Sequence, residues 1–394
     1  MLEKTKVIQP RIYKDLKRAI DNGRFPHSIL FSGNTYSGRL TAALECSSII
    51  LDSSSLYKCI PNIYLSLGRP YLVDVKAKVE LYKKYLNNKS FSNLLDSFFV
   101  VVLLLSFASL REENGGKSIL DKDNTQEFLS IFDILITLEN PYEKSNEIVP
   151  LVNKALTIVE KIKNQTGFSI KDIRAFKEAS ELHTVNGNAR IFIVEDLENA
   201  GNSAKNAFLK LLEEPPENTY FFIISKSKER LGETILSRLA PFNFNVVNGN
   251  EKNSVIVSYN EDGRKYDTIE DFFLSIGFEE SAMIKKMAMD FAISTIVQKN
   301  EMAARNIILT LFSNTRDNGV KAPYLMQIFT SQILHIAFAD INIVEYINRA
   351  TEGFPYLYYP NLLKALNNAK NRVETYNQTI RNSALILMDD LLEL

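Results

Sequence analysis

Cysteine and histidine are scarce in this chain, which limits the chemistry that it can carry. Its 394 residues include two cysteines and three histidines. Cys46 and Cys59 are too few for a disulfide framework, and too few for a four-ligand zinc site without histidines nearby. His27, His183 and His335 are scattered, and no pairing of a nucleophile with a general base emerges. We therefore expect two reduced thiols and no metal site.

The chain also lacks a net charge of either sign. Its 46 Lys and Arg residues and 47 Asp and Glu residues leave a formal net charge of -1. Because electrostatic binding to nucleic acid needs a basic surface, tight autonomous binding to DNA is not expected. The opening residues, MLEKTKVIQP, are charged and lack the apolar centre of a signal peptide, so we expect a cytoplasmic protein.

No apolar run is long enough to predict a membrane-spanning helix. The most apolar run, FFVVVLLLSFASL, extends from Phe98 to Leu110, whereas a spanning helix needs roughly 20 such residues. Asp96 precedes the run, and a glycine pair at Gly115 and Gly116 follows it. This pattern predicts a buried or packed helix that ends at the glycines, without membrane contact.

Short apolar strands alternate with helices up to about residue 250. HSILFSG, NIYLSLG, ARIFIVEDL and TYFFIISKS are strand candidates, and GRLTAALECSSIIL, IKDIRAFKEASEL and NSAKNAFLKLLEEPP have helical period. Strands separated by helices predict a parallel sheet that helices cover on both faces. Beyond Asn250 the chain reads as helices, apart from a possible hairpin at SVIVSYNEDGRKYDTI.

The stretch LFSGNTYSGRLTAAL, which begins at Leu30, has the form of a phosphate-binding loop with altered residues. Such a loop needs two spaced glycines, a lysine for the terminal phosphates and a hydroxyl for magnesium. Gly33 and Gly38 have the required spacing. Arg39 stands at the lysine position, and Leu40, at the hydroxyl position, cannot ligate a metal.

Four motifs around this loop resemble those of the AAA+ clamp-loader subunits of the bacterial replicative polymerase. They are GRFPHSILFSG, IKDIRAFKEASEL, NAFLKLLEEPP and ILSRLAPFNF. The resemblance implies an α/β plus all-α fold: an AAA+ P-loop module with a parallel sheet at 1–245, a small helical lid at 246–298 and a C-terminal helical collar domain at 299–394. An inserted helical subdomain is expected within the first of these, at about 69–167, because a connection this long is unusual.

Departures from the family pattern Gly-x-x-Gly-x-Gly-Lys-Thr indicate a branch that does not use ATP. Tyr36 replaces a glycine that lets backbone amides close around phosphate. Together with Arg39 and Leu40, this change should abolish productive ATP binding. The acidic pair that would hold magnesium and orient water is reversed, as Glu195-Asp196. We expect no bound cofactor, which favours the delta-prime branch of the family over the ATPases gamma and tau.

The remaining motif residues are expected to be structural. Ser225 matches a polar sensor, but without a nucleotide to sense it is assigned no catalytic role. The lid region has no Gly-Ser-x-Arg motif for a second sensor arginine, and the four-cysteine zinc module of many family members is missing. The acids and prolines of LEEPP, Glu213 to Pro216, are read as a helix terminus.

Arg238 is the residue that the resemblance assigns to catalysis. SRL at 237–239 matches the family motif SRC, whose arginine reaches the ATP of the adjacent subunit. The planar, permanently charged guanidinium suits a transferring phosphoryl group. The implied partners are the gamma/tau and delta subunits, with the sliding clamp and primed DNA contacted through the complex.

Two other functions stay open at this point. One is an active gamma-like or tau-like ATPase with an unusual loop, and the other is an AAA+-derived adaptor outside the replisome. Whether the chain is an enzyme is therefore undecided. The altered loop predicts no intrinsic ATPase, and the resemblance implies a place as a component of the DNA polymerase III holoenzyme.

Overall fold

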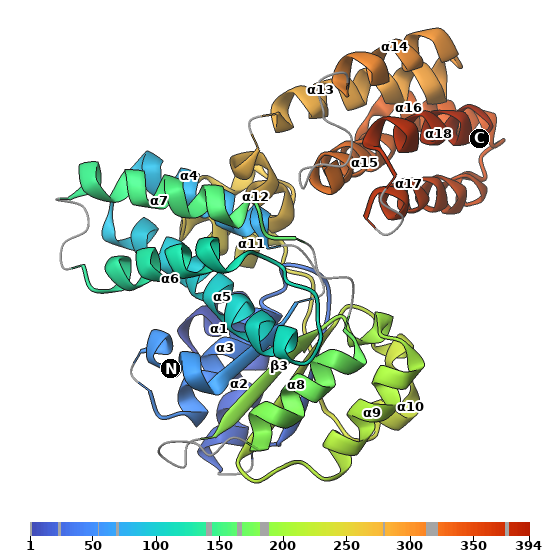
Figure 1. Cartoon of the computed structure of the whole chain (residues 1–394). Coiled ribbons are helices and arrows are strands. Elements are labelled where there is room, and N and C mark those ends of the chain that lie inside the picture. The colour runs from blue at the N-terminus through green and yellow to red at the C-terminus, as the bar shows by residue number, and fades with distance from the viewer. Residues whose placement is uncertain are drawn as a thin grey trace. The chain divides into compact units, whose positions relative to one another are not determined.

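The chain divides into two compact units, Met1–Phe273 and Leu274–Leu394 (Figure 1). The structure is a computed structural model that describes residues 2–22, 25–53, 55–67, 71–138, 144–163, 168–181, 189–278, 280–312, 322–374 and 378–394. The first unit contains the sheet, and the described part of the second unit is helical.

A five-stranded parallel sheet in the order β2-β3-β4-β1-β5 forms the centre of the first unit. Its strands are Ser28–Ser32 (β1), Ile63–Ser66 (β2), Arg190–Glu195 (β3), Thr219–Ser225 (β4) and Ala240–Asn243 (β5). The predicted parallel α/β sheet is confirmed. The loop after β1 leaves the carboxyl edge of the sheet between β4 and β5, and open α/β sheets bind their ligands at this edge.

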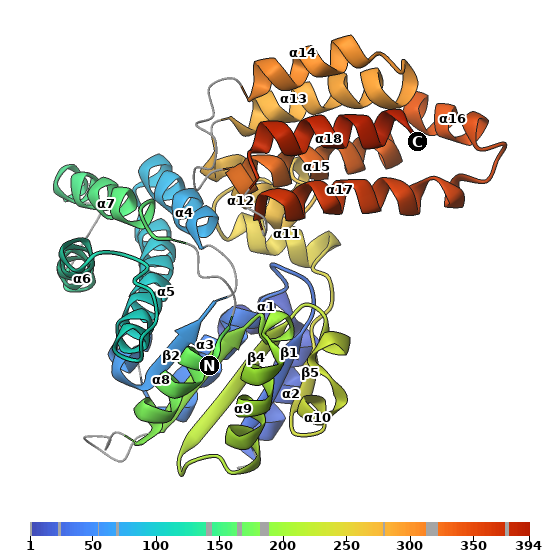
Figure 2. The same cartoon turned by 45° about the vertical axis from the view of Figure 1, so that its right-hand side comes forward.

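Helices cover both faces of this sheet (Figure 2). The helices α8 (Ile170–Glu181) and α9 (Asn202–Glu213) lie on one face, and α2 (Pro10–Asp21) and α3 (Arg39–Ile50) lie on the other. Side chains alternate along a strand. Within β3, Phe192 therefore packs into a buried cluster that also contains the rings of α8 and α9. A short helix, α1 (Glu3–Ile8), precedes α2.

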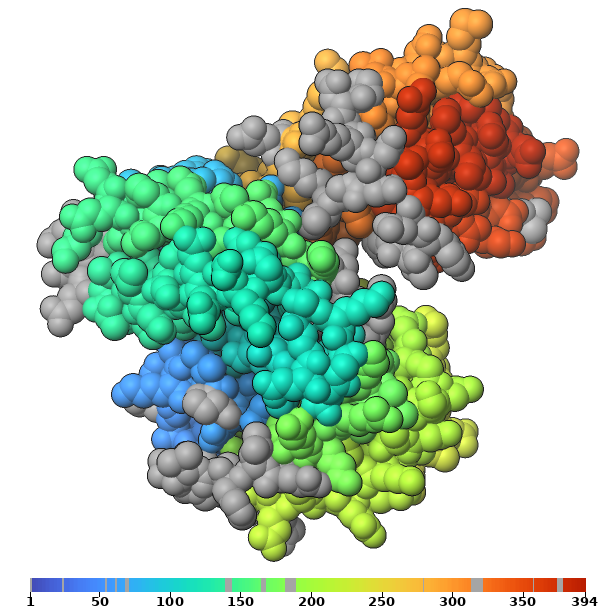
Figure 3. Space-filling view, in the orientation of Figure 1, coloured from blue at the N-terminus to red at the C-terminus, as the bar shows by residue number. Residues whose placement is uncertain are grey.

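Four helices form the connection between β2 and α8. They are Leu72–Tyr85 (α4), Asn88–Glu113 (α5), Lys122–Ile136 (α6) and Ser145–Val159 (α7), and the side chains of α5, α6 and α7 form a continuous surface (Figure 3). The described part of this connection is helical, and the inserted subdomain stays a prediction. Its expected ends, at about 69 and 167, lie outside the described residues.

The helix α5 is longer than the apolar run from which it was predicted. It has 26 residues, and within the described part of the chain it is one helix long and apolar enough to cross a membrane. However, 67% of its most apolar window is buried inside the structure. The Asn87 side chain caps its start, and the Gly116 N–H donates to the Arg111 carbonyl just past its end. The predicted buried helix is confirmed.

The predicted hairpin at SVIVSYNEDGRKYDTI is wrong. The segment begins inside a helix, α11 (Gly249–Val257), and continues into a 3-10 turn, η4 (Gly263–Lys265). The Asp262 side chain accepts a hydrogen bond from the Arg264 N–H, so the Asp-Gly pair starts this turn and does not join two strands. The consecutive apolar residues that suggested a strand include Val255 and Ile256, which are buried on one face of the helix.

Outside the sheet, several short elements complete the first unit. These are η1 (Leu56–Asn62), η2 (Leu197–Asn199), η3 (Lys228–Leu231) and α10 (Glu233–Leu236), and α12 (Ile269–Gly277) begins there. The buried rings Phe272 and Phe273 of α12 pack against Tyr259. The start of the predicted lid region therefore packs through aromatic side chains.

The second unit is built of packed helices. They are α13 (Ser281–Ala292), the π-helical turn Ile293–Val297, α14 (Glu301–Leu311), α15 (Ala322–Ala339), α16 (Ile341–Ala350), η6 (Pro355–Leu357), α17 (Tyr359–Glu374) and α18 (Ile380–Leu392). The ring of Phe329 on α15 lies 5.0 Å from Phe291 and 5.7 Å from Phe312, at the centre of the apolar interior. The boundaries proposed at 245/246 and 298/299 stay predictions.

Candidate functional site

Two glycines with positive φ shape the loop between β1 and α3. Gly33 has φ +150° and Gly38 has φ +92°. A Cβ atom at Gly33 would lie 2.6 Å from the carbonyl oxygen of Phe244, and one at Gly38 would lie 2.9 Å from Ile8 Cγ2. Both glycines are therefore required by their surroundings as well as by their backbone angles.

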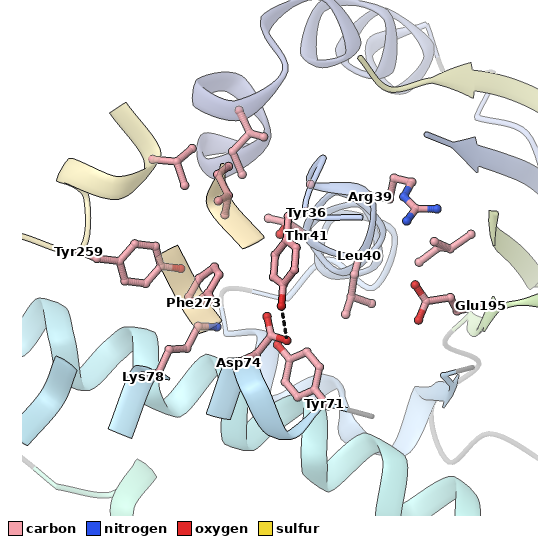
Figure 4. A pocket seen from close by; sticks show the side chains of 15 residues that line it. Tyr36, Arg39, Leu40, Thr41, Tyr71, Asp74, Lys78, Glu195, Tyr259 and Phe273 are labelled. Atoms are coloured by element: carbon pink, nitrogen blue, oxygen red, sulfur yellow. Dashed lines mark hydrogen bonds between the residues drawn. The ribbon is translucent and has the colours of Figure 1, made fainter. Parts of the chain in front are cut away.

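Tyr36 adopts the left-handed conformation that suits glycine, the residue of the family pattern. Its φ is +57°, a costly angle for a bulky residue. The ring stacks on Phe273, with centroids 5.4 Å apart and an interplanar angle of 24°. Its hydroxyl points to Asp74 Oδ2 of α4, at 3.5 Å (Figure 4). The tyrosine therefore spans the space between the loop, α12 and the insert.

A cavity of about 120 Å³ remains beside the loop. Besides loop residues, its walls come from α4, α11, α12 and the segment after α11, including Tyr71, Asp74, Lys78, Tyr259 and Phe273. Aromatic side chains occupy much of the wall that faces Tyr36 (Figure 4).

Arg39 and Leu40 begin the helix that follows the loop. The Arg39 side chain is buried, with 4% of its residue surface exposed. Figure 4 shows it on the same side of the cavity as Glu195. Leu40 also lines the cavity, and its hydrocarbon side chain offers no oxygen to a cation. Arg39 and Leu40 therefore lie at the start of the helix that follows the loop, and both line the cavity.

The acidic pair ends β3 at the carboxyl edge of the sheet. Glu195 is buried and lines the cavity, whereas Asp196 turns away from the strand with φ +70°. Burial raises the pKa of Asp196 to about 6, and the charge of Glu198 adds to this effect. Glu198 accepts a hydrogen bond from the Lys226 N–H at 2.8 Å. Among the described residues, no group of three or more acids, histidines or cysteines is arranged to hold a metal.

The buried Ser225 takes part in the local backbone network. Its carbonyl oxygen accepts a hydrogen bond from the Gly33 N–H at 3.1 Å. Its Oγ accepts from the Ser227 N–H, also at 3.1 Å. The serine thus joins the end of β4 to the start of the loop.

Cys46, Cys59 and His27 are not part of the described lining of the loop cavity. Cys46 and Cys59 are buried free thiols, and burial raises the pKa of the Cys46 thiol far above its ordinary value. His27 stacks on Tyr220, with ring centroids 4.7 Å apart. His335 lies in α15 of the second unit, and His183 lies outside the described residues.

Arg238 lies in the turn between α10 and β5, and it is not part of the described lining of the cavity. Its Nη2 donates to Glu213 Oε1 at 2.6 Å, and its Nη1 donates to the Thr234 carbonyl oxygen at 2.6 Å. One third of its side chain, 33%, is exposed. The structure therefore brings the LEEPP and SRL motifs together. The sequence assigned Glu213 only to a helix terminus and did not predict its ion pair with Arg238, because no local pattern joins residues 25 positions apart.

The order of the strands and the position of the loop define the class of protein to which the first unit belongs. A parallel sheet in the order β2-β3-β4-β1-β5, with a P-loop after β1 and acids at the end of β3, forms an AAA+ module. Residues 133–248 match the family described as "DNA polymerase III, delta subunit".

Curated relatives match a short part of the chain. The chain is 39% identical over 79 residues to DNA polymerase III subunit delta' of Escherichia coli, covering 20% of this chain and 23% of the relative. The same subunit of Buchnera aphidicola is 37% identical over 71 residues, covering 18% and 22%. That of Haemophilus influenzae is 33% identical over 85 residues, covering 22% and 26%. The chain thus spans about a quarter of the length of these relatives.

A solved structure of a gamma subunit-related protein of DNA polymerase III from Thermotoga maritima aligns with 62% of this chain, and the alignment covers 89% of the Thermotoga chain. Its sequence identity is 19% and its TM-score is 0.30. Residues 133–248, and the shorter stretches shared with the delta' relatives, are similar to the clamp-loader family that includes the delta' and gamma/tau subunits of DNA polymerase III.

Proposed function

We propose that the chain is a delta-prime-like subunit of the replicative clamp loader that does not itself hydrolyse ATP. In this role it helps to load the sliding clamp onto primed DNA in the cytoplasm, as a partner of the gamma/tau and delta subunits. The observation that carries the proposal is Tyr36. Its ring lies beside the altered loop and stacks on Phe273, and the cavity that remains is about 120 Å³.

The second part of the proposal is that Arg238 acts in trans, as an arginine finger for the ATP of a neighbouring subunit. Its partial exposure and its position in a turn support this role. A guanidinium presents donors in a rigid fork that matches phosphate oxygens, and it stays charged at every physiological pH. The chain would then contribute to hydrolysis without binding nucleotide.

The other two functions make different predictions. An active gamma-like ATPase would bind ATP with magnesium as an isolated chain. An adaptor outside the replisome would fail to co-purify with the gamma/tau and delta subunits. Co-purification from cells that express tagged chain at its natural level is therefore the first experiment, and absence of the loader subunits would exclude the proposed role.

The finger is tested by Arg238→Ala in a reconstituted loader. Hydrolysis at the one affected site should fall by about 10³-fold or more, by analogy with other arginine fingers. Arg238→Lys should rescue poorly, because a point charge does not reproduce the bidentate fork. The measurement is ATP turnover stimulated by DNA and clamp, in a complex where only the site facing this chain can hydrolyse.

A control and an assembly check complete this experiment. Arg230→Ala removes another exposed arginine of the same region and should leave turnover unchanged. Gel filtration should show the same complex for every variant. An assembled Arg238→Ala complex with wild-type turnover would remove Arg238 from the mechanism.

A further inference from the structure

An ion pair outside the loop cavity joins two elements of the first unit. Glu213 is the last residue of α9, and Arg238 follows α10. The Arg238 Nη2 donates to Glu213 Oε1 at 2.6 Å. On the other side of the guanidinium, Nη1 donates to the Thr234 carbonyl oxygen at 2.6 Å and to Ser237 Oγ at 3.3 Å. The group is therefore held at both of its terminal nitrogens.

The hydrogen bonds at Nη1 and Nη2 orient the planar guanidinium of Arg238, and they use only some of its N–H donors. A guanidinium has five N–H donors. As far as the described residues show, the three bonds leave Nε–H and one Nη2–H for a further acceptor. The exposed fractions of the two side chains are 33% for Arg238 and 47% for Glu213. An acceptor on another molecule can thus reach the arginine while the pair is intact.

The carboxylate is attached to a rigid support. Phe208 and Leu212, in the last turns of α9, are buried in the core cluster beside the sheet, and Pro215 and Pro216 prevent the helix from continuing. By contrast, no hydrogen bond or ion pair among the described residues joins the adjacent Glu214 to Arg238. The two neighbouring acids therefore differ in their contacts with the arginine.

We propose that Glu213 is a positioning residue for Arg238, and this inference rests on the proposed role of Arg238 as a finger in trans. The carboxylate holds the plane of the guanidinium so that its remaining donors stay available to a phosphate of the neighbouring subunit. A donor that is already oriented loses less conformational freedom when charge develops on that phosphate. Glu213 should consequently affect kcat at the neighbouring site more than the affinity for ATP.

The test compares Glu213→Ala with Glu214→Ala in the reconstituted loader, where only the site facing this chain can hydrolyse ATP. Glu213→Ala should lower kcat about 2- to 5-fold, the range expected when one exposed charged contact is lost, with KM for ATP unchanged. Glu213→Gln keeps an oxygen acceptor and should recover part of the rate. Glu214→Ala should match the wild type.

A double variant gives a second readout. Glu213→Ala should not slow an Arg238→Ala complex further, because the acid acts through the arginine and the two effects are then not additive. An additional loss equal to that in the wild-type background would show that Glu213 acts independently, and would overturn the inference. If Glu213→Ala impairs assembly, the positioning role is tested with Glu213→Gln instead. An assembled Glu213→Gln complex with unchanged kcat contradicts the positioning role.

The failures of the two proposals are distinguishable. Wild-type turnover of Glu213→Ala, together with slow turnover of Arg238→Ala, would reject the positioning role and retain the finger. Faster turnover of Glu213→Ala would mean that the acid restrains the arginine, which also rejects positioning. Wild-type turnover of Arg238→Ala would reject the finger itself, and the inference about Glu213 with it.

Discussion

Asp196 is the residue whose protonation the fold changes most clearly at the end of β3. Its pKa is raised from the ordinary value of 3.8 to about 6, mainly by burial. The folded state therefore retains this proton to a higher pH than the unfolded state does. The contribution of Asp196 to the free energy of unfolding is fully present below about pH 4 and is lost as pH rises through about 6.

Replacement of Asp196 by asparagine should consequently stabilise the protein at neutral pH. The amide has no proton to lose, and asparagine tolerates the left-handed backbone at this position. We expect the free energy of unfolding of Asp196→Asn to exceed that of the wild type by about 1 kcal/mol at pH 7.5, allowing for partial solvent exposure. At pH 4 the two should differ little. Urea unfolding followed by circular dichroism at both values measures this.

A matched control is available at Asp52. This aspartate also has a positive φ, +47°, but it is exposed. Asp52→Asn makes the same change from carboxylate to amide at an exposed left-handed position, and its effect on stability is subtracted from that of Asp196→Asn. If Asp196→Asn shows no gain at pH 7.5 relative to pH 4, the carboxylate is not held in its neutral form by the fold.

At the scale of elements, α5 connects the insert to the sheet module. Toward its start, the ring of Phe98 packs on Phe128 of α6, with centroids 5.4 Å apart. Toward its end, the ring of Phe107 lies 4.8 Å from Phe176 of α8, and Phe107 belongs to the buried cluster beside β3 and β4. One helix therefore supplies side chains to two apolar clusters, so the insert is continuous with the module that carries it.

Two substitutions in α5 test the contributions of the two apolar clusters separately. Phe107→Ala should destabilise the sheet module by about 3–5 kcal/mol, because it leaves a cavity in the core. Phe98→Ala should weaken the packing of α6 instead. Hydrogen exchange of the β3 amides should therefore accelerate more in Phe107→Ala than in Phe98→Ala. The exposed Ser109 on the same helix serves as a control, and Ser109→Ala should change neither. Equal acceleration of β3 in both phenylalanine variants would mean that the insert and the sheet unfold as one cooperative unit.

At the scale of the whole molecule, a chain that binds no nucleotide should be indifferent to ATP. A ligand that binds only the folded state stabilises it, by about 4 kcal/mol at 1,000 times its Kd. We therefore expect no change in the unfolding temperature of the intact chain with millimolar Mg-ATP.

The triple variant Tyr36→Gly, Arg39→Lys and Leu40→Thr is expected to hydrolyse no ATP, because the reversed acids remain and the lid lacks the second sensor arginine.

Two outcomes would contradict this expectation. A magnesium-dependent rise of several degrees in the wild-type chain would favour the active ATPase. Appreciable hydrolysis by the triple variant alone would show that the loop was the single defect. Thermal unfolding and phosphate release, measured on the same preparations, distinguish binding from hydrolysis.

Local sequence patterns determined four of the five strands, the helices α3, α5, α8 and α9, and the positions of the two loop glycines. Apolar period and helix-ending residues act within a few positions, so they can be read without knowing the fold. The same local reasoning failed at α11, where Val255 and Ile256 fit a strand pattern but lie on the buried face of a helix. It identified Tyr36 as a replaced glycine, but it did not identify Phe273 as the ring on which Tyr36 stacks.

Only the tertiary structure decided which distant residues meet. The Glu213–Arg238 pair exists because α9 and α10 pack against each other beside the sheet. Likewise, the Tyr36–Phe273 stack and the contact of Phe107 with Phe176 join segments that are separate in the sequence. Such contacts depend on the strand order and on how apolar faces are buried together. Those are properties of the whole packed core, and no short stretch of sequence specifies them.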